Sequence, residues 1–91
     1  PEKIECEIIC KETGTDAETA SKLVKIGHTA RNLKGHGLDE GISTRLLVYG
    51  AELIKQGIKP RAACRMALVR PITDDADIRA TLDHAIDTLF A

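Results

Sequence analysis

Aromatic residues are nearly absent from this sequence of 91 residues, which has one tyrosine, one phenylalanine and no tryptophan. Proteins that bind single-stranded nucleic acids use aromatic side chains as stacking platforms, and phosphate backbones are bound by an excess of basic residues. No such excess exists here, since 13 Lys and Arg are balanced by 14 Asp and Glu to a net charge of −1. These two absences argue against a nucleic-acid partner.

Long apolar segments are absent as well. The apolar segment LLVYGA, at positions 46–51, extends over about six residues, whereas a membrane-spanning helix needs about 20. The sequence also shows no signal peptide. We therefore expect a protein that does not interact with a membrane.

Cysteines are few, and their pattern is not that of a disulfide framework. Cys6, Cys10 and Cys64 are odd in number and lack the spacing of small disulfide scaffolds, so we expect a reducing, cytoplasmic environment. The length predicts one small domain over residues 1–91, with little room for an enclosed ligand cavity. A start at Pro1 fits either a piece of a longer protein or removal of an initiator methionine.

The segment around positions 15–35 carries signals for both ends of a helix. Thr15 and Glu18 form the T-x-x-E pattern of a capping box, and Gly35 after Lys34 is a typical stop. We expect a helix over about residues 16–34. Apolar or small residues recur at helical spacing at Ala20, Leu23, Val24, Gly27 and Ala30.

Three more helices are predicted toward the C-terminus. Segment 44–56 is apolar around most of its circumference, which is typical of a helix at the centre of a bundle. Pro60 suits the first position of a helix that runs to about Val69, where Arg70-Pro71 closes it. The last helix has Thr73 as its predicted cap. Its apolar stripe consists of Ile78, Leu82, Ala85, Ile86 and Leu89.

The first segment, at positions 2–13, is ambiguous. Every second residue from Ile4 to Cys10 is apolar, as in a strand, while Lys3, Glu7 and Lys11 have the spacing of helical ion pairs. We favour a helix, because Gly14 supplies a stop and no other strand is available for pairing. The sequence thus predicts an all-α fold, a compact bundle of about five helices.

Three glycines at positions 35, 37 and 41 resemble a phosphate loop, but their spacing is one residue too long for the dinucleotide fingerprint and a helix precedes them. A turn that needs positive φ is the favoured interpretation. His36, beside Asp39 and Glu40, is kept as a weak functional candidate.

Two other groups of side chains have structural interpretations that outweigh chemical ones. Cys6 and Cys10 lie on one helical face but lack a second ligand pair, so we expect thiols that fill the core and no metal site. Asp74, Asp75 and Asp77 form an acidic cluster, which is what the dipole of a helix favours in its first turn.

Arg45 is the unusual residue. With Ser43 as N-cap and Thr44 as the first helical residue, Arg45 lies beside unpaired backbone amides, where a cation is unfavourable by about 0.3–1 kcal/mol. Either Asp39 or Glu40 pairs with it, or its guanidinium reaches an anion, most plausibly a phosphate. Arg61, directly after Pro60, repeats the pattern as a weaker candidate.

The runs RNLKGHGLDEGISTRLLVYGAELI and PRAACRMALVRPITDD resemble the C-terminal domain of the CbbQ/NirQ/NorQ family, members of the MoxR branch of the AAA+ ATPases. The resemblance covers essentially the whole chain. It implies a helical lid whose arginine, Arg45, is the sensor 2 residue that reaches the ATP phosphates, with Ser43 and Thr44 starting its helix. Relatives often have proline where this chain has Thr44.

The resemblance further implies ATP and Mg²⁺ bound by an α/β core with the Walker A and Walker B elements, which this chain lacks. It also implies a ring, usually a hexamer, and a partner with a von Willebrand factor A domain. The client enzyme would be Rubisco for a CbbQ-like member, which the sequence favours, or nitric oxide reductase for a NirQ/NorQ-like member.

Two other functions remain open at this point. A self-sufficient helical interaction module would use Arg45 only in an ion pair, and a small metal-dependent enzyme would use the cysteines with His36. On either the lid or the module interpretation, the 91 residues alone are not expected to be catalytic.

Overall fold

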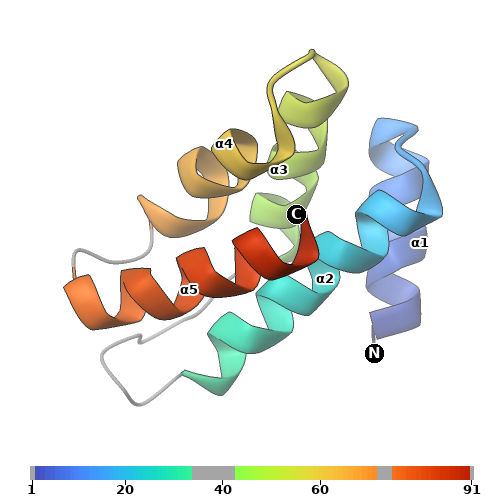
Figure 1. Cartoon of the computed structure of the whole chain (residues 1–91). Coiled ribbons are helices and arrows are strands. Elements are labelled where there is room, and N and C mark those ends of the chain that lie inside the picture. Colours follow the sequence, from blue (N-terminus) through green and yellow to red (C-terminus); the bar gives the residue numbers. More distant parts are fainter. Residues whose placement is uncertain (1, 34–42, 72–74, 91) are drawn as a thin grey trace.

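The computed structural model describes residues 2–33, 43–71 and 75–90, and these are helical with short connections (Figure 1). This confirms the predicted all-α fold. The elements are α1 (Glu2–Thr13), α2 (Ala17–Asn32), α3 (Thr44–Lys55), α4 (Pro60–Cys64), the π-helix η1 (Arg65–Val69) and α5 (Ala76–Leu89).

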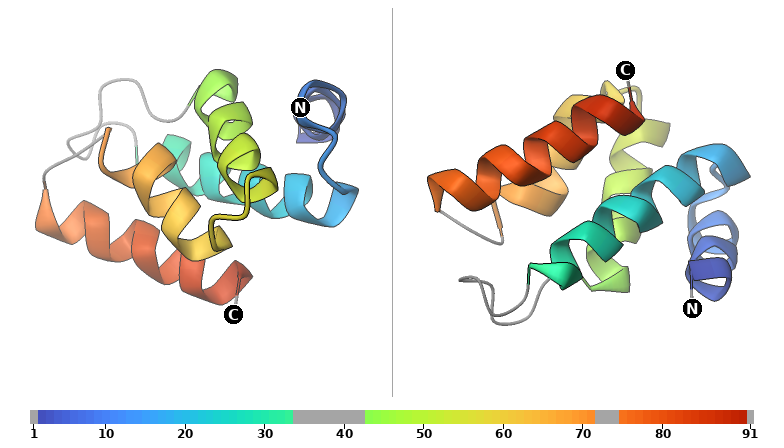
Figure 2. Two further views of the ribbon diagram at one scale, coloured as in Figure 1. Left: turned by 90° about the horizontal axis from the view of Figure 1, so that it is seen from above. Right: turned by 60° about the horizontal axis from the view of Figure 1, so that its bottom comes forward.

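Helices α2 and α3 form the middle of the bundle. Helix α1 packs on one side against both of them, and α4, η1 and α5 lie on the other side (Figures 1 and 2). The largest fully buried side chains come from all of these elements, as expected for a single core. They are Ile9, Leu23, Ile26, Leu47, Leu68, Leu82, Ile86, Val24, Val69 and Cys64.

Helix α1 resolves the ambiguity of the first segment in favour of a helix. It ends at Gly14, whose φ of 74° is the left-handed conformation that glycine adopts easily, and the Gly14 amide donates to the Cys10 carbonyl at 2.8 Å. Ile9 is its one fully buried side chain among those described. The alternation that resembles a strand does not match what is buried, since Ile4 and Ile8 are 52% and 40% exposed.

The predicted capping box of α2 is wrong by one residue. Asp16, not Thr15, is the N-cap, and its two carboxylate oxygens accept from the backbone amide and the hydroxyl of Thr19 at 3.0 and 2.7 Å. A carboxylate is the stronger acceptor at a helix start, so the aspartate wins over the neighbouring threonine. The helix ends at Asn32 with Leu33 as C-cap, and the predicted stop at Gly35 lies outside the described residues.

The predicted cap of α5 is corrected in the same way. Asp75 is the N-cap instead of Thr73, and its Oδ1 accepts from the backbone amides of Asp77 and Ile78 at 2.9 and 3.1 Å. Thr73 and Asp74 themselves lie outside the described residues.

The helix that begins at Pro60 has the predicted extent but not a uniform geometry. Its last five residues form the π-helix η1, in which the Arg70 amide donates to the Arg65 carbonyl at 3.1 Å, five positions back. Three consecutive residues, Ala67, Leu68 and Val69, are buried there. The π turn thus lies in a buried part of the chain.

A close approach joins α2 and α3. At Gly27, a Cβ atom would lie 3.2 Å from a methyl group of Leu47, so the absence of a side chain lets Leu47 pack directly on the α2 backbone. None of the helices in the described ranges is both long and apolar enough to cross a membrane.

Candidate functional site

The start of α3 has the frame that the sequence predicts. Ser43 is the N-cap in extended conformation, with φ −83° and ψ 161°, and Thr44 is the first helical residue. The Ser43 hydroxyl accepts from the Leu46 amide at 3.4 Å, a long hydrogen bond. Arg45 is therefore the second residue of the first turn, beside backbone amides that have no intrahelical partner.

Arg45 is exposed, and within residues 2–33, 43–71 and 75–90 no hydrogen bond or ion pair holds its guanidinium. The first turn of α3 also contains no acidic residue. An exposed cation thus lies in the same helical turn as backbone amides that lack an intrahelical partner, and both attract anions. The alternative partners Asp39 and Glu40, like His36, lie outside the described residues.

A contact among three helices, which the sequence did not predict, lies at this helix start. Glu5 of α1 accepts two hydrogen bonds from the Arg31 guanidinium of α2, Nη1 to Oε1 at 2.6 Å and Nη2 to Oε2 at 2.7 Å. The same Oε2 accepts from the Thr44 hydroxyl at 2.8 Å. An acid that favours the α3 dipole is thus present, but it comes from another helix.

The electrostatics of this contact keep Glu5 ionised. Hydrogen bonding to Arg31 lowers the pKa of Glu5 below its usual 4.5, burial opposes this, and the Thr44 hydroxyl lowers it further; Glu5 in turn raises the pKa of Arg31. The Glu5 side chain is 13% exposed and that of Arg31 36%. Glu5 forms its ion pair with Arg31 and none with Arg45.

We expect the free energy of unfolding to fall as the pH is lowered below about 4.5. A lowered folded-state pKa gives stability that is present above the unfolded-state pKa and is lost as the pH falls through the folded-state value. Glu5→Gln should remove about 1 kcal/mol of this acid-sensitive stability, a figure kept small because Arg31 is partly solvated. Urea denaturation between pH 7 and pH 3 measures it.

The matched control is Glu12→Gln, which makes the same change at an exposed acid of the same helix. Equal flattening of the pH profile by both variants would contradict a specific contribution of Glu5.

Arg61, the second candidate for an anion contact, is engaged inside the domain. Its Nε donates to the Phe90 carbonyl at 3.2 Å and lies 3.9 Å from Asp87 Oδ1. The C-terminal end of a helix favours a cation, so this contact supports a structural role at the end of α5. Arg65 also links this segment to α5, through ion pairs with Asp83 at 3.2 Å and Asp87 at 2.9 Å.

The three cysteines differ in burial. All three are free, and no group of three or more Cys, His, Asp or Glu side chains is placed to hold a metal ion in the described parts of the chain. Cys64 is fully buried, and burial raises its pKa to about 12, so its thiol stays protonated. Cys6 and Cys10 are only half buried.

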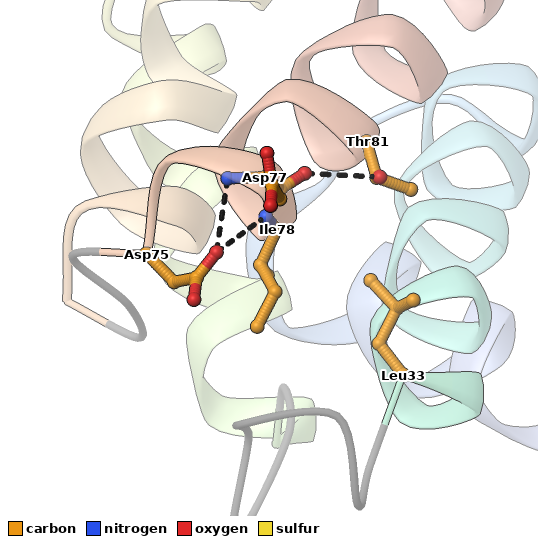
Figure 3. A pocket seen from close by; sticks show the side chains of 5 residues that line it. All are labelled: Leu33, Asp75, Asp77, Ile78 and Thr81. Carbon is orange, nitrogen blue, oxygen red and sulfur yellow. Dashed lines mark hydrogen bonds between the residues drawn. The ribbon is translucent and has the colours of Figure 1, made fainter.

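Asp75 and Asp77, at the start of α5, line a pocket of about 280 Å³, and Leu33, Ile78 and Thr81 are among its described lining residues (Figure 3). Asp75 is used as the helix cap, and the Thr81 hydroxyl donates to the Asp77 backbone carbonyl at 3.1 Å. The observed cap supports the interpretation that these acids stabilise a helix start.

These observations define a small all-α domain that, in its described part, presents an exposed arginine without a hydrogen-bond or ion-pair partner at the start of a central helix. The chain belongs to the CbbQ/NirQ/NorQ family: the family model described as CbbQ/NirQ/NorQ C-terminal matches residues 5–89. The matched region thus contains both Glu5 and Arg45.

Three curated relatives agree with this assignment. The chain is 60% identical over 89 residues to Protein CbbQ of Hydrogenophilus thermoluteolus, covering 98% of the chain and 33% of that protein. It is 38% identical to Protein NorQ of Paracoccus denitrificans over 94% of the chain, and 42% identical to the denitrification regulatory protein NirQ of Pseudomonas aeruginosa over 91%. It covers 32% of each of these two, so the chain spans about a third of the length of its relatives.

Proposed function

We propose that this chain is the C-terminal helical lid of a CbbQ-type AAA+ ATPase of the MoxR branch, in which Arg45 acts as the sensor 2 residue. The observation that carries the proposal is the geometry of Arg45: an exposed guanidinium in the first turn of α3, with no partner among the described side chains. Family membership and the 60% identity to a CbbQ protein support it.

The chemistry of the helix start fits a phosphate. A guanidinium donates several hydrogen bonds in a plane that matches phosphate oxygens, and free amides at a helix N-terminus add partial positive charge. Such donors stabilise the charge that develops during phosphoryl transfer. In the assembly proposed here, Mg²⁺ would be held together with ATP by the core, through carboxylate and phosphate oxygens.

The rest of the mechanism requires a longer polypeptide. Relatives about three times the length of this chain leave room for an α/β core with Walker A and Walker B elements. The lid would rotate against this core when Arg45 forms or breaks its contact with the γ-phosphate. We propose a cytoplasmic ring, a hexamer, that works with a von Willebrand factor A partner.

The client enzyme follows from the subtype. The identity of 60% to CbbQ, against 38% and 42% to NorQ and NirQ, favours a CbbQ-like protein and therefore Rubisco as the client. A lid of a NirQ/NorQ-type ATPase that assists maturation of nitric oxide reductase is the second candidate, supported by the same family match.

The isolated 91-residue chain should not hydrolyse ATP, whereas the polypeptide that joins it to its core, called here the complete ATPase, should. The reason is that this chain lacks the Walker A element that would hold the phosphates. The release of inorganic phosphate, measured for the isolated chain and for the complete ATPase at equal molar concentration, tests whether hydrolysis depends on the core. Equal rates for the two would contradict this dependence.

A further inference from the structure

We propose that Glu5 is a positioning residue for Arg45: through Thr44 it fixes the first turn of α3 and so determines where the Arg45 guanidinium is presented. The role of Glu5 rests on the proposed phosphate contact of Arg45 and adds to it the residues that orient this side chain.

The hydrogen bonds at the start of α3 show why Glu5 matters. In the side-chain cap of the helix, the Leu46 amide donates to the Ser43 hydroxyl at 3.4 Å, while the Thr44 hydroxyl donates to the Glu5 carboxylate at 2.8 Å. Hydrogen bonds to an ionised acceptor are shorter and stronger than those between neutral groups. The residue directly before Arg45 is therefore held more firmly by α1 than the helix start is held by its local cap.

Glu5 can serve as a fixed point because Arg31 orients it. Two parallel hydrogen bonds of 2.6 and 2.7 Å define the plane of the carboxylate, and its side chain is only 13% exposed. A bidentate arginine contact fixes direction as well as distance. A continuous chain of hydrogen bonds thus connects Arg31 of α2, Glu5 of α1 and Thr44, the residue before Arg45.

The body of α3 does not depend on this contact. Leu47, Gly50 and Ala51 are buried in the core and hold the helix from its second turn onward. Loss of the Thr44 hydrogen bond should therefore loosen the first turn, with Arg45 in it, and leave the domain folded.

Thr44→Val in the complete ATPase tests the proposal, because valine keeps the branched shape and removes the hydroxyl. We expect kcat/KM for ATP to fall about fivefold, since small misplacements of a charged group are costly in phosphoryl transfer. Thr44→Ser keeps the hydroxyl and should stay near the unmodified rate. The thermal midpoint of Thr44→Val, from circular dichroism, should change little, and Glu5→Gln should lower kcat/KM in the same direction.

The Arg45→Ala background separates positioning from a general loss of stability. If Thr44 acts through Arg45, adding Thr44→Val to Arg45→Ala should cause no further loss, whereas independent effects would multiply. Two results would overturn the positioning role of Glu5 but not the proposed function. One is that the effects of the two substitutions multiply, and the other is that Thr44→Val keeps the unmodified rate while Arg45→Ala is impaired. An unimpaired Arg45→Ala would overturn the proposed function itself and, with it, a positioning role toward phosphate.

Discussion

Arg45→Ala is expected to lower kcat/KM for ATP in the complete ATPase by about 100-fold or more, the usual effect of removing one donor from developing phosphate or oxyanion charge. The side chain is exposed, so its removal takes away no hydrogen bond or ion pair within the described ranges. The expected result is a loss of turnover in a domain that remains folded. Steady-state ATP hydrolysis, together with far-ultraviolet circular dichroism, measures both quantities.

Two further substitutions sharpen this prediction. Arg45→Lys retains the charge but not the planar donor pair, so an intermediate rate is expected. Arg79→Ala removes an exposed arginine from α5 and serves as the matched control, with an expected rate near that of the unmodified protein. Normal turnover in Arg45→Ala would favour the alternative of a helical interaction module.

Leu47→Ala should lower the free energy of unfolding by about 3 kcal/mol, within the range measured for fully buried leucines. Leu47 is 0% exposed and its methyl groups pack on the α2 backbone at Gly27, so truncation leaves a cavity between the two central helices. Urea denaturation of the domain measures the loss. Met66→Ala, at a side chain that is 41% exposed, is the control, for which about 1 kcal/mol or less is expected.

The Gly27 contact gives this prediction a second, independent check. Replacing glycine by alanine inside a helix usually raises the free energy of unfolding by about 1 kcal/mol. In the unmodified domain, a Cβ at position 27 would lie 3.2 Å from Leu47, so we expect crowding to cancel this gain in Gly27→Ala. In the Leu47→Ala background, the same substitution should recover about that much. Identical effects of Gly27→Ala in both backgrounds would show that the two residues are not coupled.

Much of the fold could be predicted because its signals are local. Gly14 and Gly57 end α1 and α3 with positive φ, Pro60 begins α4, and Ser43 starts α3 in the predicted frame. The misassigned caps of α2 and α5 show the limit of such signals. In each case a threonine precedes an aspartate by one or two residues, both types are common caps, and the aspartate is the observed cap.

The support of the candidate site could not be predicted, because it joins residues that are far apart in the chain. Glu5 and Arg31 are separated by 26 positions, and Glu5 and Thr44 by 39. One local feature pointed to a partner elsewhere in the chain: the first turn of α3 has a cap, Ser43, but no acidic residue of its own to favour the helix dipole. The phosphate contact of Arg45 stays a prediction for the experiments above.

The π-helix η1 accommodates one extra residue within the helical segment that begins at Pro60. A turn that closes over five residues, as between Arg65 and Arg70, contains one residue more than an α-helical turn. Deleting a single residue from η1 would restore a continuous α-helical repeat and leave the residues just after it on nearly the same helical face, because the wider turn already absorbs the extra position. The extra position therefore adds a buried residue to this segment without changing the face on which Arg70 lies.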